Sequence, residues 1–199
     1  MTAAPSADVG GSLRPALAEV DRQSFREGMA RLAAAVNIVT SDGPAGLAGA
    51  TVSAVCSLTD TPPALIVCVN RSSRSHAAIA ANGVFCVNAM AGTDHEIAHI
   101  FAGGTGAGPA ERFERVRHGT LATHAPALDA ALTAFDCEVV QMVDFGTHTI
   151  FIGRVVAMRR GEGSDGLIYF RRRYLSTGDA IRVGEPVPLS LAFDLDWIR

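Results

Sequence analysis

The chain of 199 residues contains no lysine, so all 17 of its basic residues are arginine. Neighbouring arginines occur only at 159–160 and 171–173, and the formal net charge is −3. A protein that holds a nucleic-acid duplex through its phosphates needs a concentrated basic surface. This pattern predicts no such surface, and we expect no nucleic-acid partner.

Close pairs of cysteines are also missing. The four cysteines, Cys56, Cys68, Cys86 and Cys137, lie singly within apolar runs, without the spacing of a zinc ribbon or a redox dithiol. No apolar run has the length of a membrane span, and the first residues lack the basic start and apolar stretch of a signal peptide. We expect buried, reduced thiols in a cytoplasmic protein with no membrane anchor.

The composition is that of a folded domain. Hydrophobic residues make up 48% of the chain and charged residues 19%, unlike a disordered protein. The length allows one domain with its own core. Residues 1–20, rich in Ala, Pro, Ser and Gly, are predicted to be a mobile tail. Residues 21–180 form the predicted domain, and 181–199 form a C-terminal extension that adds an edge strand or a dimer contact.

The spacing of apolar residues predicts a mainly β fold. A helix is expected over 21–35, because Phe25, Met29 and Leu32 recur at helical spacing, and a strand over 36–40 follows it. Two short helices are expected at 75–81 and 93–101, each with a hydroxyl residue placed to cap its N-terminus. Further runs typical of strands occur at 48–58, 64–69, 84–89, 134–143, 147–158 and 167–170. Strands so closely spaced, with one long hairpin across 144–146, indicate an antiparallel barrel.

Three hydroxyl residues share one face of the segment 48–58. Thr51, Ser53 and Ser57 have odd spacing, so an extended chain points them to the same side, while small apolar residues fill the other. Short hydroxyls and backbone amides suit a polar, planar ligand such as a flavin ring. An ordinary strand surface would carry the same residues.

The segment 70–76, Asn-Arg-Ser-Ser-Arg-Ser-His, joins the end of a predicted strand to the start of a predicted helix. Hydroxyl groups, guanidinium groups and free helix amides converge there, as a phosphate monoester requires. The alternative is that Ser75 is only a helix cap and the arginines are solvated.

These two segments resemble the flavin reductase family with the FMN-binding split-barrel fold. The similarity lies in Thr-x-Ser-Ala-x-x-Ser-Leu from Thr51, the following Pro62-Pro63, and Asn-x-Ser-Ser from Asn70. It continues in order through 85–88, 101–103, 112–113, 135–138, 146–155 and 167–174. The chain is most similar to the reductases of pyrimidine utilisation and of 4-hydroxyphenylacetate hydroxylation, over about residues 25–174.

The resemblance implies the residues of a flavin pocket. The ring and ribityl chain would be lined by Thr51, Val52, Ser53, Ala54 and Ser57, and the phosphate end by Asn70, Arg71, Ser72, Ser73 and Ser75. The pocket would be completed by Asn88, Ala89, Met90 and Ala91. His148 resembles the family's histidine beside the nicotinamide, although Thr147 stands where the family often has Asp. Arg173 and its two preceding arginines either contact NAD(P)H phosphates or are exposed.

The function implied by the resemblance is reduction of FMN or FAD by NADH or NADPH, with the reduced flavin supplied to a separate monooxygenase. Members of the family are usually homodimers. Two alternatives remain open at this point. One is a flavoprotein of the same fold that reduces another acceptor, such as a corrinoid, and the other is a flavin-binding protein without catalysis.

A competing motif is His95-Glu96-Ile97-Ala98-His99, which fits the H-E-x-x-H pattern of zinc peptidases. The extended pattern needs Gly at 102 and His at 105, where this chain has Ala102 and Thr105. Because zinc needs a third protein ligand, we expect no metal site and keep a zinc metallopeptidase as a remote alternative.

Overall fold

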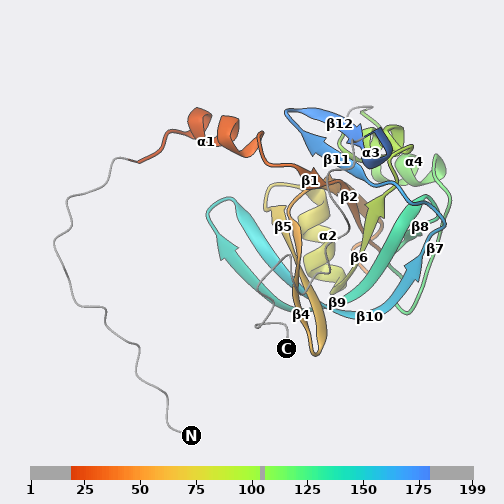
Figure 1. Ribbon diagram of the computed structural model, residues 1–199. Coiled ribbons are helices and arrows are strands. Elements are labelled where there is room, and N and C mark those ends of the chain that lie inside the picture. The colour runs from red at the N-terminus through yellow and green to blue at the C-terminus, as the bar shows by residue number, and fades with distance from the viewer. Residues whose placement is uncertain (1–18, 104–105, 180–199) are drawn as a thin grey trace, which may run out of the picture.

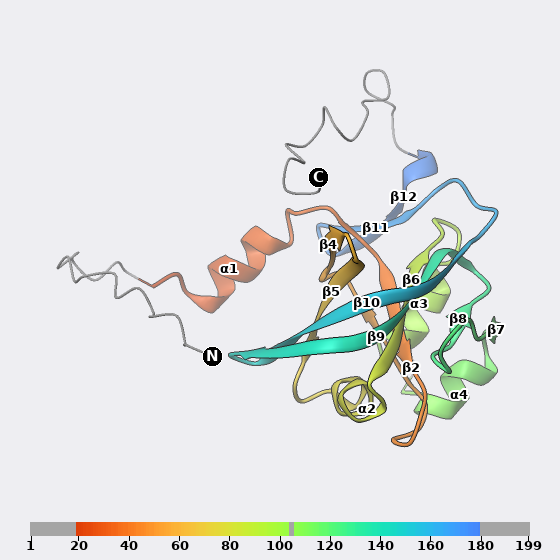
Figure 2. The same ribbon diagram turned by 90° about the horizontal axis from the view of Figure 1, so that it is seen from below.

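The computed structural model describes residues 19–103 and 106–179. Its main feature is a seven-stranded antiparallel sheet in the order β3-β2-β6-β9-β10-β5-β4 (Figures 1 and 2). The strands are β2 (Asn37–Ser41), β3 (Ala48–Val52), β4 (Val55–Asp60), β5 (Pro63–Asn70), β6 (Val84–Met90), β9 (Ala131–Phe145) and β10 (His148–Arg160).

The sheet curls into a split barrel because of how its edges are connected. β3 and β4 are the two edge strands, yet only Ser53 and Ala54 separate them in the chain. A connection of two residues cannot cross seven strands, since each neighbouring pair is about 4.8 Å apart. The sheet therefore bends until its two edges meet at this turn. The predicted antiparallel split barrel is confirmed.

Shorter helices and two small sheets accompany the barrel. The helices are α1 (Arg22–Met29), α2 (Arg74–Asn82), α3 (His95–Phe101), α4 (Pro109–Glu114) and a 3₁₀ turn (Thr177–Asp179). A three-stranded sheet joins β1 (Ala34–Ala35), β11 (Leu167–Phe170) and β12 (Arg173–Ser176), and a two-stranded one joins β7 (His118–Gly119) and β8 (Ala127–Leu128). In both views α1 stands away from the barrel (Figures 1 and 2), and it buries none of its residues. No helix in the described ranges is long and apolar enough to cross a membrane.

The barrel interior is a core that α2 completes through Ile79. Its buried members are Val39, Leu65, Val67, Val69, Ile79, Phe85, Val87, Cys137 and Phe151. Gly153 of β10 makes room for Phe85, because a Cβ at this position would lie 2.3 Å from that ring. This close approach excludes every larger residue from position 153.

A second cluster attaches α3 and α4 to the barrel. It is formed by Val36, Ile38, Met90, Ala98, Phe101, Phe113, Leu128 and Leu167. The rings of Phe101 and Phe113 meet edge to face with centroids 5.0 Å apart, and both lie against Gly49, where a Cβ would be 2.7 Å from Phe101. A glycine in β3 thus allows α3 to lie directly on the edge strand.

Several predicted boundaries were wrong. The helix predicted over 21–35 ends at Met29. The strand predicted over 48–58 is two strands, interrupted at Ser53 and Ala54. Ser73, not Ser75, caps α2, and the N-cap of α3, Asp94, makes no side-chain capping bond. The predicted tail 1–20 lies outside the described residues except for its last two, and the extension 181–199 lies outside them entirely.

Candidate functional site

Two neighbouring cavities follow β3 and together form what we call the β3 groove. One, of about 320 Å³, lies over Ala48–Ala50 and is bounded by Ser73–Ser75 and Arg112. The other, of about 220 Å³, lies over Thr51–Ser53 and is bounded by two tyrosines, Tyr169 and Tyr174. Ala102, directly after α3, lines both cavities.

The first end of the groove is suited to an anion. Ser73 caps α2 by accepting a hydrogen bond from the backbone N–H of His76 at 3.1 Å, and the start of this helix, Ser73–Ser75, lines the cavity, where the positive end of the helix dipole favours an anion. Arg74 and Arg112 line the same cavity, and no Asp or Glu of the described residues does. Arg112 is held in place because its Nε donates to the carbonyl of Ala107 at 2.9 Å. The N-terminus of α2 and two guanidinium groups therefore border one space.

Ser75 adds a hydroxyl that has no use in the fold. It is 7% exposed, it lines the cavity, and its side chain makes no hydrogen bond with any other described residue. No buried side-chain oxygen of the described residues lacks a partner, so the Ser75 hydroxyl is open to the cavity rather than enclosed in the fold. A ligand oxygen in the groove would accept its hydrogen bond.

The second end of the groove is bounded by two aromatic rings. Tyr169 and Tyr174 face each other across the β11–β12 hairpin, with ring centroids 5.7 Å apart in an edge-to-face arrangement. Burial raises the pKa of Tyr174, and the neighbouring Tyr169 raises it further. Opposite them, the Thr51 hydroxyl donates to the carbonyl of Ala98 at 2.6 Å, whereas Ser53 is exposed. The result is a space bounded by two tyrosine rings on one side and by Thr51–Ser53 on the other.

His148 lies at the same end of β5 as the turn between β3 and β4. The backbone N–H of Cys68 donates to Ala54 at 3.0 Å, and Asn70, two residues further along β5, pairs with His148 of β10. His148 is exposed, and its Nδ1 lies 2.9 Å from the Thr147 hydroxyl. The register thus brings the histidine to the edge of the site without putting it inside the groove.

A chain of hydrogen bonds connects the first turn of α2 to the hairpin that carries His148. The hydroxyl of buried Thr149 donates to Oδ1 of Asp144 at 2.5 Å, and it lies 2.7 Å from Nε2 of His76. Asp144 in turn forms an ion pair with Arg71 at 3.4 Å. Because a hydroxyl has only one hydrogen to donate, Nε2 of His76 must be the donor to Thr149.

Comparison with known proteins identifies the family. The flavin reductase like domain matches residues 29–178. The chain is a flavin reductase family member. It is 50% identical to "FMN reductase (NADH) RutF" of Ancylobacter novellus over 155 residues, which cover 78% of this chain and 84% of the relative. It is 49% identical to the RutF protein of Serratia proteamaculans over 158 residues, 79% of this chain and 89% of the relative.

Solved structures agree with this assignment. BorF, the flavin reductase component of a bacterial two-component tryptophan halogenase, superposes with a TM-score of 0.73 at 27% identity, covering 78% of this chain and 98% of BorF. The styrene monooxygenase flavin reductase of Pseudomonas putida S12 gives 0.67 at 26% identity, covering 83% and 99%. The resemblance drawn from the sequence is therefore confirmed at the level of family and fold.

The structure of this flavin reductase brings together only part of the predicted pocket. Thr51, Val52, Ser53, Ser73 and Ser75 line the β3 groove, and Ala54 lines an adjoining cavity. Asn70 and Ser72 lie beside the groove and bond to each other, with the Ser72 hydroxyl 2.8 Å from Asn70 Oδ1. Arg71 points to Asp144, and Arg173 is exposed on β12.

Ser57 is set apart from Thr51 and Ser53. Because the chain turns at Ser53 and Ala54, Ser57 belongs to β4. It lines a separate, largely apolar cavity of about 440 Å³ together with Cys56, Phe135 and Met158. The expectation that the three hydroxyls share one strand face was wrong, since it assumed a continuous strand. Cys56 is also exposed, contrary to the expectation that all four thiols are buried.

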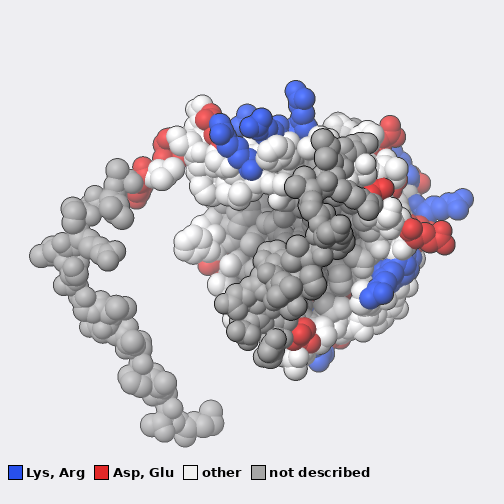
Figure 3. All heavy atoms as spheres, in the orientation of Figure 1, with Lys and Arg blue, Asp and Glu red and all other residues white. Residues whose placement is uncertain are grey.

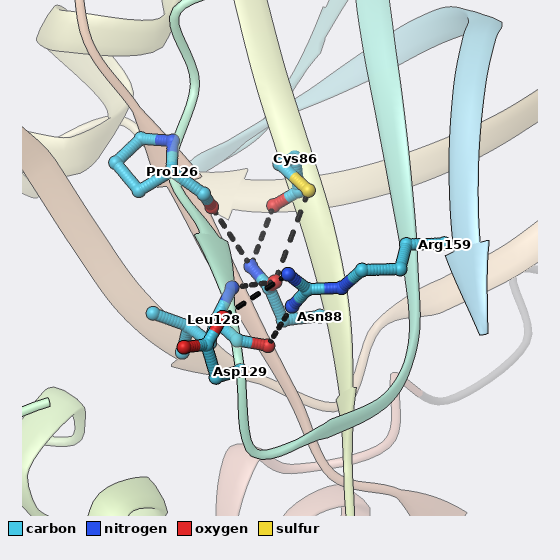
Figure 4. Close-up of polar contacts among 6 residues, drawn as sticks. All are labelled: Cys86, Asn88, Pro126, Leu128, Asp129 and Arg159. Carbon is cyan, nitrogen blue, oxygen red and sulfur yellow. Dashed lines mark hydrogen bonds and ion pairs between the residues drawn. The ribbon is translucent and has the colours of Figure 1, made fainter. Parts of the chain in front are cut away.

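The side chain of Asn88 is committed to the protein interior (Figure 4). It is fully buried, and its Oδ1 accepts from the backbone N–H of Leu128 at 2.7 Å. Its Nδ2 donates to Ile38 at 3.0 Å and also lies near carbonyls of Cys86 and Pro126. Arg159 supports the same loop by binding the Leu128 carbonyl and Asp129. Asn88 therefore holds the 126–129 loop on the barrel and has no group left for a ligand.

Ala89, Met90 and Ala91 also fall outside the groove. Met90 is 1% exposed and belongs to the core beneath α3. Ala89 and Ala91 flank it, and none of the three lines either cavity of the groove. Sequence order after β6 suggested a pocket position, but the strand instead packs between β2 and β9.

The H-E-x-x-H segment forms α3 and presents its polar residues outward. His95, Glu96 and His99 are all exposed. No group of three or more His, Cys, Asp or Glu side chains in the described residues is arranged to hold a metal ion. Ala98 and Phe101 of the same helix pack into the core, so the spacing of the motif reflects a helix with one buried face.

Several residues that line the groove were not assigned to the pocket from the sequence, among them Arg74, Ala102, Arg112, Tyr169 and Tyr174. The sequence did contain an indication of the two tyrosines. They flank the Phe-Arg-Arg-Arg segment, at positions that oppose each other in a tight hairpin. Arg112 lies in a segment that matches the family, but it reaches the groove only through the contact of α4 with β3, so its place in the site could not be read from the segment.

Proposed function

We propose that this protein is an NADH-dependent FMN reductase that releases reduced flavin to a separate monooxygenase. The observation that carries the proposal is the β3 groove. It joins an anion site at α2 to a site between two tyrosine rings of the β11–β12 hairpin, in a chain about half identical to proteins named FMN reductase (NADH).

The two ends of the groove match the two ends of FMN. The phosphate would accept hydrogen bonds from the α2 amides, from Ser75 and from Arg74 and Arg112. The ring would lie along Thr51–Ser53, where backbone groups and the Ser53 hydroxyl bond its polar edge. Tyr169 and Tyr174 would pack on its flat part. The ribityl chain would pass over Gly49 and Ala50, whose small side chains leave room for it.

Hydride transfer from nicotinamide to flavin is chemistry that the two cofactors supply when both are bound. The protein residues therefore orient the rings and exclude water. His148 would contact the nicotinamide from the edge of the site. Thr147 holds the His148 ring through Nδ1, a neutral contact where related proteins often have a carboxylate. The main role of these side chains would be to align the two rings.

A homodimer is part of the proposal. Apolar side chains are exposed on the β9–β10 hairpin and on the segment that contains α1. They are Val140, Met142, Val143 and Phe145 on the hairpin, Phe25 and Met29 on α1, and Leu32 just after it. Phe145 alone is 82% exposed. Apolar surface of this extent is usually covered by another protein surface, and a second copy of the chain would cover it. We propose that the dimer acts in the cytoplasm, where NADH is available.

The experiment is a flavin-dependent oxidation assay. Purified protein should oxidise NADH when FMN is added and should consume little NADH without it. Gel filtration should separate FMN from the protein at micromolar concentration, as transfer to a partner requires. Absence of flavin-dependent oxidation at saturating NADH would refute the proposal. Flavin that stays bound through gel filtration would indicate a flavoprotein that reduces another acceptor, such as a corrinoid.

A further inference from the structure

The end of the β9–β10 hairpin has little support of its own. It projects at the left of the barrel in Figures 1 and 3, and Figure 3 shows its surface as mostly uncharged. Phe145 is 82% exposed, and the turn after it contains Gly146, whose φ is 55°. His148 follows with an exposed side chain. Hairpin ends with few buried contacts open locally at low cost in free energy, so a histidine that must meet a second ring at a fixed place needs other anchors.

The two residues beside His148 are both anchored to the start of α2 and the connection before it. On one side, the carbonyl of Thr147 accepts a hydrogen bond from the backbone N–H of Arg71 at 3.0 Å. On the other side, the hydroxyl of Thr149 accepts one from Nε2 of His76 at 2.7 Å. Successive side chains of a strand point to opposite faces, so Thr149 is buried while His148 is exposed. These anchors hold the backbone of His148 and leave its side chain free to contact a ligand.

A carboxylate completes the second anchor. Asp144, on the other strand of the hairpin, pairs with Thr149 in the β9–β10 register and accepts the hydrogen bond of its hydroxyl at 2.5 Å. Because that hydroxyl has one hydrogen and gives it to Asp144, it is oriented to accept from His76. The ring of His76 is held in turn by an edge-to-face contact with Phe151, with ring centroids 5.3 Å apart. These side chains form one connected unit between the hairpin and α2.

The buried hydroxyl is the stronger of the side-chain links. The second oxygen of Asp144 lies 3.4 Å from Arg71, but both side chains of this ion pair are about half exposed, and exposed pairs are screened by water. Thr149 is 0% exposed, and a hydrogen bond in the interior is stronger because the surroundings are less polar. Loss of the Thr149 hydroxyl should therefore loosen the hairpin more than loss of the ion pair.

The residues between the two anchors line the anion end of the β3 groove. Ser73 and Ser75 border that cavity, and they lie in the chain between Arg71 and His76. In the proposed function this short segment binds the flavin phosphate and also holds His148. Hydride transfer requires the two rings to meet in a fixed geometry. A shared support fixes the position of one cofactor relative to the other, whereas separate supports would add their independent motions.

We propose that Thr149, His76 and Asp144 are positioning residues for the nicotinamide, acting through His148. The inference rests on the proposed function and adds to it the residues that place the two cofactors relative to each other. None of the three lines either cavity of the β3 groove, so their effect on the reaction passes through His148. That effect is to hold the His148 backbone at a fixed place relative to the flavin phosphate.

The test compares the same substitution at two buried threonines of the full-length protein. Thr149→Val removes the hydroxyl that joins the hairpin to α2, and Thr149→Ser restores it. His76→Phe keeps a ring beside Phe151 but has no donor. Thr40→Val is the matched control, because Thr40 is also 0% exposed and its hydroxyl donates to the carbonyl of Pro126. Thr40 lines neither cavity of the groove.

KM and kcat for NADH are measured at saturating FMN, below the temperature at which each variant begins to unfold. Thr149→Val and His76→Phe should lower kcat/KM for NADH about tenfold, since a small misplacement of a reacting group has at least this effect. Thr149→Ser should recover most of the activity. Thr40→Val should lose stability without loss of kcat/KM. The FMN dissociation constant should change by less than about twofold in all four variants.

A double-mutant cycle with His148→Ala identifies the route of the effect. If Thr149 acts through His148, Thr149→Val should hardly lower kcat/KM further in a His148→Ala background, because the residue that it positions is gone. Two independent contributions would multiply instead. Hydrogen exchange of residues 144–150 supplies a readout that does not depend on activity. Thr149→Val should accelerate exchange there about tenfold, and Thr40→Val should leave it unchanged.

Three results would overturn the inference. The first is a folded Thr149→Val variant with the wild-type kcat/KM for NADH. The second is a loss that is equally large in the His148→Ala background or in Thr40→Val, since either would make the effect a general one of the fold. The third is weaker FMN affinity with unchanged NADH kinetics, which would place the network under the phosphate alone. A wild-type protein without flavin-dependent NADH oxidation would refute the proposed function itself, and unchanged hydrogen exchange in Thr149→Val would then refute the anchoring separately.

Discussion

The hydroxyl of Thr149 accepts a hydrogen bond from Nε2 of His76 at 2.7 Å, which joins β10 to the first turn of α2. The same hydroxyl donates to Asp144 at 2.5 Å, so one buried atom connects the anion site at α2 with the hairpin that carries His148. The side chain of His76 is also fixed by an edge-to-face contact with Phe151 at 5.3 Å.

Thr149→Val should therefore destabilise the protein. Valine has nearly the shape of threonine but leaves Asp144 and His76 without their shared partner, which costs about 1–3 kcal/mol in the free energy of unfolding. Urea unfolding measures the loss. Thr149→Ser, which keeps the hydroxyl, should recover most of it, and a valine variant as stable as the wild type would contradict the role of this contact.

Asn88→Ala tests the reassignment of Asn88 from the pocket to the fold. The change leaves the Leu128 N–H and several carbonyls unsatisfied in the interior, and we expect a loss of about 3 kcal/mol in stability. The FMN dissociation constant of the folded fraction should stay within about twofold of the wild type, since two sites without shared partners behave independently. A tenfold weaker FMN affinity at unchanged stability would return Asn88 to the pocket.

The sequence predicted the strands better than their interruptions. The strand at 167–170 was predicted with the bounds it has, and the β9–β10 hairpin was found because its alternating runs flank Phe145-Gly146. The turn at Ser53 and Ala54 was missed because neither residue is a strong turn former. It exists because the barrel must bring its two edges together, which is a property of the whole sheet.

The candidate site was predicted in its local parts only. Ser73 and Ser75 were found because a strand end followed by hydroxyls and a helix is a local pattern. Asn88 was assigned to the pocket because nothing in its neighbourhood indicates that a loop 38–40 residues later closes over it. Tyr174 and Arg112 lie in segments that match the family, but they reach the groove through packing of separate elements, so their place in the site could not be predicted from the segments alone.

Ser75 and Ser73 form a matched pair for testing the anion site. Ser75→Ala removes a hydroxyl that has no protein partner, so stability should be unchanged or slightly higher while the FMN dissociation constant rises about tenfold. Ser73→Ala removes the cap of α2 and should cost about 1 kcal/mol of stability. Flavin titration and thermal unfolding on both variants give the comparison. A Ser75→Ala variant with wild-type FMN affinity would show that the phosphate binds elsewhere.

The buried thiols predict a fall in stability at alkaline pH. Burial, with a smaller effect of the Asp136 charge, raises the pKa of Cys137 to about 12 and raises that of Cys86 further. In the unfolded chain both thiols ionise near 9, so between pH 9 and 10 the unfolded state binds fewer protons than the folded one. The free energy of unfolding should then decrease by up to about 1.4 kcal/mol per pH unit for each thiol.

Urea titrations at pH 8, 9 and 10 measure this slope, and the absence of lysine from the chain removes one group that would otherwise titrate nearby. Cys137→Ala lowers stability at every pH by creating a cavity, but it should reduce the slope by about half. The exposed Cys56 provides the control, because Cys56→Ser should leave the slope unchanged. A stability that is constant from pH 8 to 10 would contradict the prediction.

His148→Ala tests the nicotinamide side of the site. The exposed imidazole opens β10 opposite Asn70, and among the described residues only the Thr147 hydroxyl bonds to its ring, so its loss should hardly affect folding. If His148 orients the nicotinamide, the variant should lower kcat/KM for NADH about tenfold or more, equivalent to about 1.4 kcal/mol, while FMN affinity changes much less. His124→Ala, at another exposed histidine, is the control.

Thr147→Val should produce a smaller loss of the same kind, because the imidazole stays but its orientation is no longer held. Unchanged NADH kinetics in a folded His148→Ala variant would remove this residue from the site.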